Sequence, residues 1–420
     1  MITINAKIQG RIRRAATAAS CVLLCFLGFT FAARAGFSRL LSEYSSSASQ
    51  MRPAEEALRF SKQDPEAHYA HALVLAEMEK AEEAVEEFES AATLRPDDYF
   101  LWLELGRARD QIDMEEGALS AFKKSVALAP FYAQPHWELG NLLLRMGRDE
   151  EAFGELRKAS ASDLTLLPAV ADLAWSTSES DAAKVVREVL PQTDAARLAL
   201  ARFLIERAAT GEAIKILRGV DKNRAHDDLH ALVKELLDVK RFEDARDLWL
   251  IERVDEEKAS IGLFDGGFEN GVFIDDPGFG WRPAQKTPGV RLALDAHEPR
   301  AGARSLLIEF EGNSDPASTI IRQIALVKPH THYRLRFSAR TSDLVTGCAP
   351  AVFVSEADNE SVLALSDSLP QGTSGWKDCS VAFTTGDVTR AILIGIKRPN
   401  CASAPVPIFG HAWFDDFALE

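Results

Sequence analysis

Residues 99–130 read YFLWLELGRARDQIDMEEGALSAFKKSVALAP, and the organisation of the first half of the chain follows from them. The same pattern occurs before and after this stretch at a spacing of 34 residues, so that three units fill residues 65–164. Four sets of small or apolar residues keep the spacing: Ala72, Gly106 and Gly140; Ala84, Ala118 and Ala152; Phe88, Phe122 and Leu156; Ala91, Ser125 and Ala159. A period of this length is typical of stacked supersecondary units, none of which can bury its apolar face alone.

Each unit is predicted to contain two amphipathic helices. In the second unit, apolar residues from Trp102 to Val126 recur at helical spacing on both sides of a polar turn at residues 110–116. Gly106 and Ala118 would lie where the two helices cross, because a bulky side chain there would push the helix axes apart. Phe122 would fill the space beneath this crossing.

The second unit resembles the tetratricopeptide repeat. It carries that family's pattern of Trp, Leu-Gly, Ala, Phe and Pro as Trp102, Leu105, Gly106, Ala118, Phe122 and Pro130. The resemblance implies a right-handed α-solenoid whose first helices line a concave groove for a peptide or protein partner. The positions expected to contact this partner are Tyr69, Leu103, Arg107, Trp137, Asn141 and Arg145. The other interpretation of the two aromatic residues is core packing, which is the usual role of aromatics at helical spacing.

The N-terminal segment has the features of an export signal. Basic residues within residues 7–14 precede an apolar run at residues 15–33, and Ala33, Arg34 and Ala35 offer a small-x-small cleavage pattern. Basic residues on the N-terminal side place that end in the cytoplasm and the rest of the chain in the periplasm or outside the cell. Residues 1–36 are therefore predicted to be a cleaved signal peptide or a signal anchor held in the inner membrane by residues 15–33.

The segments that follow are predicted to be a tether and then helices. Residues 37–53 are small and serine-rich, as a tether would be. Residues 54–164 would hold a capping helix and the three repeats, and residues 165–260 keep the helix-pair period without its glycine and proline, which predicts degenerate helical-hairpin repeats. The net charge of −15 argues against a nucleic-acid partner, because phosphate binding needs a basic stripe.

Residues 261–420 change to a period of two. Tyr333, Leu335, Phe337 and Ala339 would point to one side of a strand, with polar residues between them on the other side. Further segments of this kind, separated by turns, are residues 305–310, 320–327, 351–355, 379–384, 391–397 and 412–419. Many short strands at this spacing predict an antiparallel β-sandwich with its own core.

This C-terminal half resembles the jelly-roll carbohydrate-binding modules of xylanases and cellulases and, more broadly, galactose-binding-like domains. The segments that carry the resemblance are DGGFENG at 265–271, GW at 280–281, AGARSL at 301–306, QIALVKP at 323–329, GWK at 375–377 and WFDDF at 413–417. In that family a structural calcium ion often ties the first strand to the last, and Glu269 and Asp415 occupy the matching places. Calcium prefers several oxygen ligands, and the glycine-rich turn at 266–271 suits it, although carboxylates near strand ends are often only solvated.

Two tryptophans of the sandwich are candidates for stacking on a sugar ring, namely Trp281 and Trp376. Core or loop packing is the other interpretation for both, and it is the favoured one for Trp413. Three cysteines of this half, Cys348, Cys379 and Cys401, allow one disulfide in an exported protein, and the first and last are the preferred pair because both flank loops.

The sequence contains few signs of catalysis. A nucleophile elbow, a phosphate loop and a dinucleotide fingerprint are all absent from it. His226 and His230 have the helix spacing of a zinc protease, but aspartate replaces the required glutamate and the sequence offers no evident third ligand.

These features favour a non-enzymatic, exported scaffold. Its repeats would bind a protein, and its sandwich would bind a glycan or another surface, in a setting such as cell-envelope polysaccharide assembly or export. Two alternatives stay open. One is a carbohydrate-active enzyme of the envelope that uses the sandwich as a targeting module, and the other is a structural adaptor that binds protein at both ends.

Overall fold

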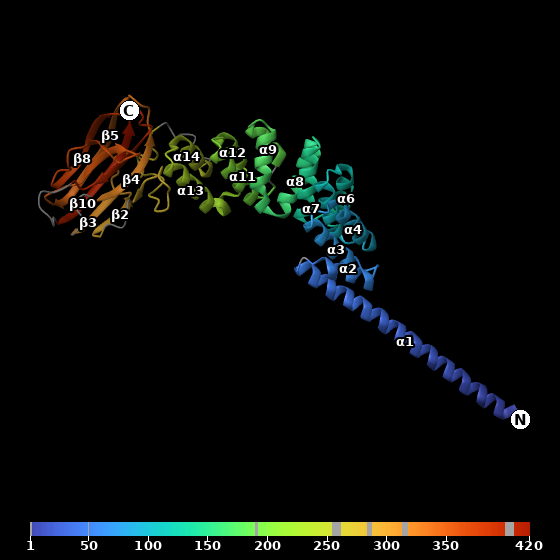
Figure 1. Ribbon diagram of the computed structural model, residues 1–420. Helices are drawn as coiled ribbons and strands as arrows, with labels where there is room; N and C mark the ends of the chain where they lie inside the picture. Colours follow the sequence, from blue (N-terminus) through green and yellow to red (C-terminus); the bar gives the residue numbers. More distant parts are fainter. Residues whose placement is uncertain are drawn as a thin grey trace. The chain divides into compact units, whose positions relative to one another are not determined.

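The computed structural model describes residues 2–48, 50–189, 192–253, 262–283, 288–312, 318–399 and 407–420. The chain forms two compact units, residues 1–203 and 204–420. The first unit is helical, and the second joins further helices to two β-sheets (Figure 1). The predicted class, an α-solenoid followed by an antiparallel β-sandwich, is therefore confirmed.

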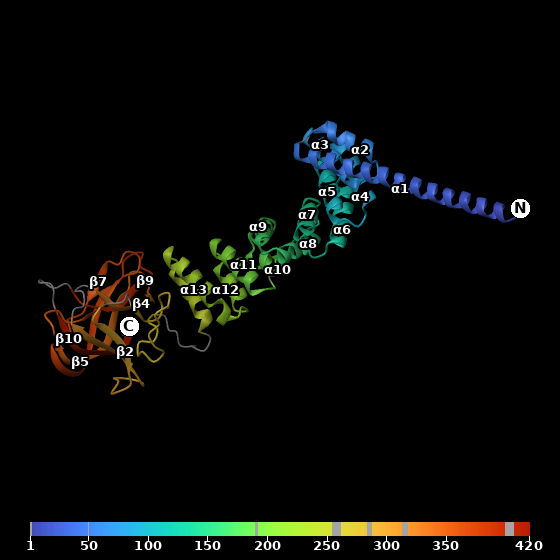
Figure 2. The ribbon, with the colours of Figure 1, turned by 90° about the horizontal axis from the view of Figure 1, so that it is seen from below.

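The three predicted repeats are three pairs of packed helices (Figure 2). These are α3 (Pro65–Glu77) with α4 (Ala81–Leu94), α5 (Tyr99–Gln111) with α6 (Glu115–Leu128), and α7 (Ala133–Arg145) with α8 (Asp149–Ser162). Two of the first helices begin at an aspartate cap: the side chain of Asp64 accepts the N–H of Glu66 at 3.2 Å, and that of Asp98 accepts the N–H of Phe100 at 3.1 Å. Buried side chains of consecutive pairs share one core, as a solenoid requires.

The small residues of the repeats lie where the two helices of a pair approach most closely. A Cβ atom added at Gly106 would overlap the ring of Phe122, and one added at Gly140 would lie 2.7 Å from Cγ of Leu156. The predicted role of Gly106 is therefore confirmed.

Replacing Gly106 by alanine is expected to destabilise the first unit by about 1–3 kcal/mol, because the added methyl group must displace a packed ring. Gly154→Ala is the matched control. Gly154 lies in α8, where an added Cβ meets nothing within 4 Å, so alanine should stabilise the helix by about 0.5–1 kcal/mol. Thermal unfolding followed by circular dichroism measures both changes, and equal midpoints for the two variants would contradict the close crossing.

The serine-rich segment is helical, so the prediction of a tether at residues 37–53 is wrong for its described part. Helix α1 (Ile2–Ala48) runs through it, and α2 (Met51–Phe60) turns back against α1. The hydroxyl of Ser38 donates to the carbonyl of Ala57 at 3.1 Å, and the rings of Phe37 and Phe60 stack with centroids 6.0 Å apart. Small serine side chains let the two helices approach closely; the buried serines are Ser38, Ser42 and Ser45.

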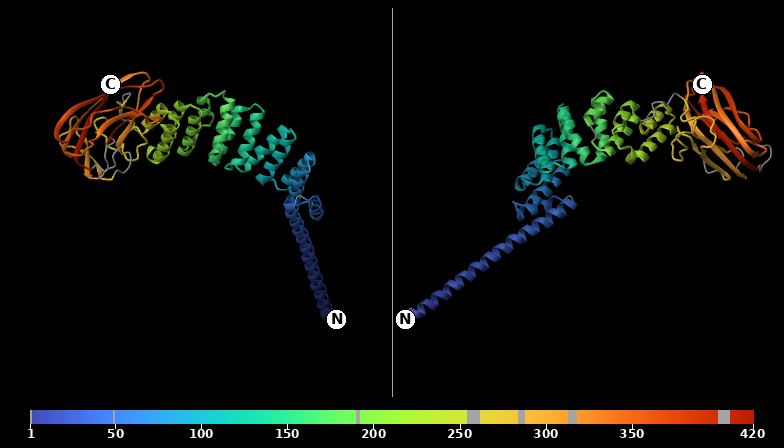
Figure 3. Two further views of the ribbon diagram at one scale, coloured as in Figure 1. Left: turned by 60° about the vertical axis from the view of Figure 1, so that its left-hand side comes forward. Right: turned by 180° about the vertical axis from the view of Figure 1, so that it is seen from behind.

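From Ala18 to Gly36, the preceding part of α1 is mostly apolar and mostly exposed. The segment Ala18–Ser45 is long enough to cross a membrane, with a mean hydropathy of 1.8, and none of its most apolar window is buried. Figure 3 shows no other described element beside the N-terminal part of this helix. Large side chains such as Val22, Phe29 and Phe31 are exposed, which is costly in water and favourable in a bilayer. A signal peptide and a signal anchor both meet this description.

The degenerate repeats are helix pairs as well. They comprise α9 (Leu167–Thr177) after a short turn η1 (Leu164–Leu166), α10 (Ala182–Val189), α11 (Asp194–Glu206), α12 (Thr210–Leu217), α13 (Lys222–Asp238), α14 (Phe242–Trp249) and a last turn η2 (Leu250–Glu252). In the second unit, Arg241 ties α14 to the preceding pair. Its guanidinium donates to the carbonyl of Ile205 at 2.5 Å and to the hydroxyl of Thr210 at 2.6 Å.

The β part consists of two five-stranded antiparallel sheets. One has the order β1-β4-β9-β6-β7 and the other the order β2-β3-β10-β5-β8. The strands are β1 (Arg282–Pro283), β2 (Val290–Asp295), β3 (Ser305–Gly312), β4 (Thr319–Leu326), β5 (His332–Val345), β6 (Ala351–Glu356), β7 (Val362–Leu365), β8 (Gly372–Thr384), β9 (Ala391–Lys397) and β10 (Ile408–Leu419). Leu335, Phe337 and Ala339 of β5 point into the shared core, as the alternation predicted, and pack with residues of both sheets.

Candidate functional site

Arg107 is at the centre of a charged network on the first helices of the repeats. Its guanidinium lies 2.7 Å from Oε1 of Glu104 on the same helix and 2.6 Å from Oε1 of Glu138 on α7. Burial lowers the pKa of Arg107, but the hydrogen bond and charge of Glu138 and the charge of Glu104 outweigh this effect and raise it. The predicted contact residue therefore carries its charge and links two consecutive repeats.

Tyr69, Leu103 and Trp137 occupy equivalent positions, 34 residues apart, but the structure places them differently. Tyr69 and Trp137 are partly exposed, whereas Leu103 is completely buried in the core between the second and third repeats. The prediction that Leu103 contacts a partner is thus wrong. The two aromatic side chains at this repeat position reach the surface, whereas the shorter leucine side chain does not.

Tyr69 is partly buried against the core of the first repeat and partly exposed at its surface. Its ring packs edge-on against Phe100 at 5.7 Å and lies tilted against Phe88 at 5.9 Å. Burial, followed by the charges of Glu104 and Glu66, raises the pKa of Tyr69 to about 12. The phenol is therefore neutral under ordinary conditions.

The remaining predicted residues lie on α7. Nδ2 of Asn141 donates to the carbonyl of Trp137 at 2.8 Å, and Arg145 is exposed and paired with Asp110 of α5. We use the term repeat face for the predicted residues that the structure leaves at least partly exposed on α3, α5 and α7. The repeat face consists of Tyr69, Arg107, Trp137, Asn141 and Arg145.

A histidine–carboxylate cluster joins the two helices of the first repeat. Nδ1 of His68 lies 2.6 Å from Oε2 of Glu87, and Nδ1 of His71 lies 3.2 Å from Oε1. Burial acts to raise the pKa of Glu87, but the hydrogen bond from His68 and the close contact with His71 outweigh it and bring the pKa to about 2. The hydrogen bond to Glu87 raises the pKa of His68, against the opposing effect of burial.

This cluster is expected to stabilise the repeats most between about pH 4.5 and 6.5. The contribution of Glu87, whose folded pKa is lowered, is present above 4.5 and is lost as the pH falls towards its folded value. The contribution of His68, whose folded pKa is raised, is present below 6.5 and is lost as the pH rises through its folded value. Glu87→Gln should lower the free energy of unfolding by about 1–2 kcal/mol in this window and by less in alkaline buffer. Urea denaturation across the pH range measures the difference, and a constant difference would contradict this assignment.

The two tryptophans predicted to bind sugar differ in burial. Trp281 is completely buried, stacked on Phe268 at 5.0 Å and near Phe417 at 5.1 Å, and its Nε1 donates to the carbonyl of Asp265 at 2.9 Å. A fully buried ring cannot stack on a sugar, so the prediction of a binding role for Trp281 is wrong. Its surroundings are those of a core residue.

Trp376 is partly exposed on the second sheet. Its Nε1 donates to the carbonyl of Glu298 at 3.0 Å. The guanidinium of Arg340 lies 5.4 Å from the centre of the Trp376 ring and 4.2 Å from that of Trp413. Trp413 is also partly exposed and donates from Nε1 to Asp295 at 2.7 Å. We call the cation–π group formed by Arg340, Trp376 and Trp413 the tryptophan–arginine cluster.

The two predicted calcium ligands hold a loop through its backbone amides. Oε1 of Glu269 accepts the N–H of Ala303 at 2.7 Å, and Oδ2 of Asp415 accepts the N–H groups of Arg300 and Ala301 at 2.8 and 3.0 Å. Burial raises the pKa of Asp415, against the backbone hydrogen bonds that lower it. Because N–H donors already point at these oxygens, the arrangement explains both carboxylates without a metal ion, and calcium stays a prediction.

The cysteines of the sandwich differ in state. Cys348 is disulfide-bonded, whereas Cys379 is a free thiol. Cys401, the other member of the preferred pair, lies outside the described residues. Burial, followed by the charge of Asp378, raises the pKa of the Cys379 thiol. This thiol is therefore a poor nucleophile at neutral pH.

Comparison with known proteins supports the repeats and nothing beyond them. Residues 65–98, the first unit, match the tetratricopeptide repeat family. No curated protein matches the chain. Among solved structures, the MamA RS-1 ArsTM double mutant is 21% identical over 40% of this chain and 95% of that chain, with a TM-score of 0.34. MamA from residue 41 onwards from Desulfovibrio magneticus RS-1 is 20% identical over 44% of this chain and 90% of that chain, with a TM-score of 0.30. At these TM-scores the two structures carry no argument about function.

Proposed function

We propose that this chain is a membrane-held scaffold that binds a segment of another protein on the repeat face. The observation that carries the proposal is the presence of partly exposed aromatic, arginine and asparagine side chains on the first helices of consecutive repeats. Tyrosine, tryptophan and arginine are the residues most enriched in the energetically important parts of protein interfaces. The tetratricopeptide match at residues 65–98 supports the same function.

The charges of the repeat face favour a polar segment of mixed charge. Arg107 is paired with Glu104 and Glu138, and Arg145 with Asp110, so acidic and basic groups alternate there. A segment that offers both charges can exchange these pairs without leaving a charge unpaired. A lone C-terminal carboxylate would have to compete with carboxylates already in place.

Helix α1 supports the proposed location at a membrane. The exposed apolar segment in Ala18–Ser45 and the basic residues before it favour insertion with the repeats on the far side of the membrane. Retention of the helix as an anchor would hold the repeats close to the bilayer, because α1 continues directly into its contact with α2. Export, and a role in envelope polysaccharide assembly, are parts of this proposal.

The repeat face is tested with the full chain in detergent and a partner purified after capture from its native membranes. The double variant Asn141→Ala and Arg145→Ala should weaken binding by about tenfold or more, the cost of losing roughly 1.4 kcal/mol. The matched control is Lys123→Ala with Lys124→Ala, two exposed residues on α6. Equal losses in both double variants would count against the repeat face.

A second function is favoured by the tryptophan–arginine cluster of the sandwich. Partly exposed rings beside a guanidinium suit a sugar, whose C–H groups stack on the rings while its hydroxyls accept hydrogen bonds. We therefore propose glycan binding at this cluster. If the chain is instead a carbohydrate-active enzyme, it should release sugar from a polysaccharide. If it is an adaptor that binds protein at both ends, it should bind no sugar.

Affinity electrophoresis of the full chain in gels that contain soluble polysaccharides tests this second function. Retardation should occur with at least one polysaccharide and should be lost in Trp376→Ala. Val362→Ala is the control, because Val362 is exposed on the other sheet. Retardation that persists in Trp376→Ala would place the glycan elsewhere.

A further inference from the structure

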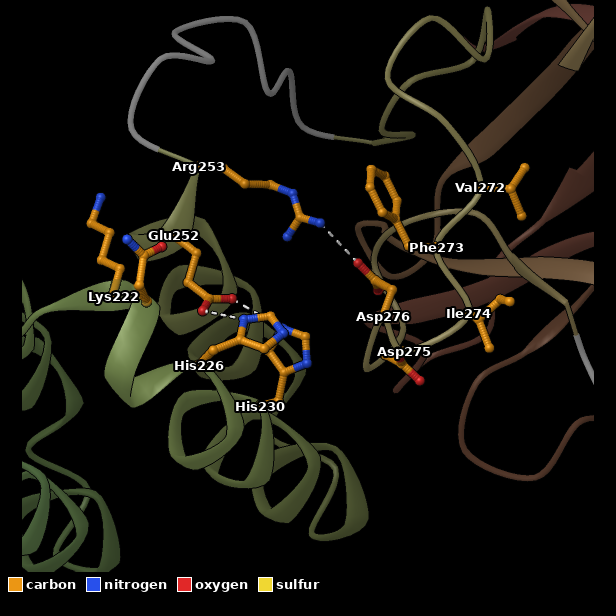
Figure 4. A pocket seen from close by; sticks show the side chains of 11 residues that line it. Lys222, His226, His230, Glu252, Arg253, Val272, Phe273, Ile274, Asp275 and Asp276 are labelled. Atoms are coloured by element: carbon orange, nitrogen blue, oxygen red, sulfur yellow. Dashed lines mark hydrogen bonds and ion pairs between the residues drawn. The ribbon is translucent and has the colours of Figure 1, made fainter.

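Three side chains from two separate elements meet beside α13. His226 and His230 lie one turn apart on this helix, and Glu252 comes from η2, later in the chain. Nδ1 of His226 lies 2.8 Å from Oε1 of Glu252, and Nε2 of His230 lies 3.0 Å from Oε2 (Figure 4). Among the described residues, these three offer ligand atoms that all lie within 4.8 Å of one another.

We propose that His226, His230 and Glu252 form a binding site for a transition-metal ion, with Zn²⁺ as the preferred ion. Two imidazole nitrogens and a carboxylate are the donors of a three-ligand zinc site, whereas calcium and magnesium prefer oxygen donors alone. The sequence pattern already offered the two histidines. The third ligand, Glu252, comes from η2, and the folding of the chain brings it beside the two histidines of α13.

The two nitrogen–oxygen distances suit such an ion after a small adjustment, and all three ligand atoms lie within 4.8 Å of one another. Ligand bonds of about 2.0–2.2 Å in a tetrahedral site place the ligand atoms roughly 3.3 Å from one another. The two nitrogen–oxygen contacts therefore need to open by only a few tenths of an ångström. Glu252 and His230 are largely shielded, with 13% and 19% of their side chains exposed, while His226 is half exposed.

The fourth position of the ion would face a cavity of about 750 Å³. The wall near the histidines includes Lys222 and Arg253, and the opposite wall includes Phe273 and Asp275 (Figure 4). An ion with three protein ligands keeps an open place for water or for an anionic group of a ligand. Lys222 favours the anionic group, whereas Arg253 is already paired with Asp276.

The test uses the full chain in detergent after removal of metals with a chelator. Co²⁺ is added first, because a tetrahedral Co²⁺ site has characteristic visible absorption, and Zn²⁺ is then used to displace it. We expect one ion per chain. His230→Gln and Glu252→Gln should each weaken binding by about tenfold or more, since even residues that only orient metal ligands are worth that much. His332→Gln, which changes an exposed histidine on β5, should leave binding unchanged.

Circular dichroism of the metal-free variants shows whether each is folded, so a loss of binding can be assigned to the ligand. Binding that is unchanged in both His230→Gln and Glu252→Gln would overturn the proposal, as would the absence of Co²⁺ and Zn²⁺ binding in the unaltered chain. Either result would leave the histidines and Glu252 as a hydrogen-bonded cluster. Binding at the repeat face is measured separately, so its outcome does not depend on this site.

Discussion

Asp276→Ala is expected to lower the free energy of unfolding of the second unit by about 3–5 kcal/mol. The carboxylate of Asp276 is completely buried, and Oδ2 accepts hydrogen bonds from Nε1 of Trp249 at 2.9 Å and from Arg253 at 3.1 Å. Its Oδ1 accepts the backbone N–H groups of Gly278 and Gly280 at 2.7 and 2.9 Å. Removing the carboxylate leaves these donors, including a cation, without their acceptor.

Urea denaturation followed by tryptophan fluorescence measures this loss, since Trp249 is itself a reporter of the site. Asp275→Ala is the matched control, because the neighbouring side chain is exposed and its loss should change the free energy by less than about 0.5 kcal/mol. Equal effects of the two substitutions would contradict the role of Asp276 in joining the helices of the second unit to the loop before β1.

Trp281→Ala should destabilise the sandwich by about 3–5 kcal/mol, because it empties a fully buried site packed by Phe268 and Phe417. Trp376→Ala should cost about 1 kcal/mol or less, since that ring is partly exposed. Differential scanning calorimetry of the full chain compares the two. A small effect of Trp281→Ala would show that the ring is not a core residue and would restore it as a sugar-binding candidate.

The fold is largely predictable from the sequence because both of its parts have a regular period. The spacing of 34 residues predicts the helix pairs, and the alternation in β5 predicts a strand with one buried face. Three strands that the sequence pattern does not predict, β1, β2 and β7, lie at sheet edges, and β1 and β7 have only two and four residues. Edge strands are short and partly exposed, so their apolar pattern is weak.

The candidate sites are less predictable because burial and long-range contacts decide them. Leu103 shares its repeat position with Tyr69 and Trp137, yet it is completely buried while the two aromatic side chains are partly exposed. Glu252 joins His226 and His230 through the packing of η2 beside α13, which local spacing does not encode. The prediction of a tether rests on the serine-rich composition alone. Composition does not reveal that α1 packs against α2, and this contact holds the segment in a helix.

Site-specific photo-crosslinking in cells tests protein binding by the repeats most directly. A photoreactive phenylalanine derivative is placed at Asn141 on the repeat face and, as a control, at Lys124 on the second helix of a repeat. Our account predicts one discrete protein adduct at Asn141 and none at Lys124. The same adducts at both positions, or adducts at Lys124 alone, would contradict it.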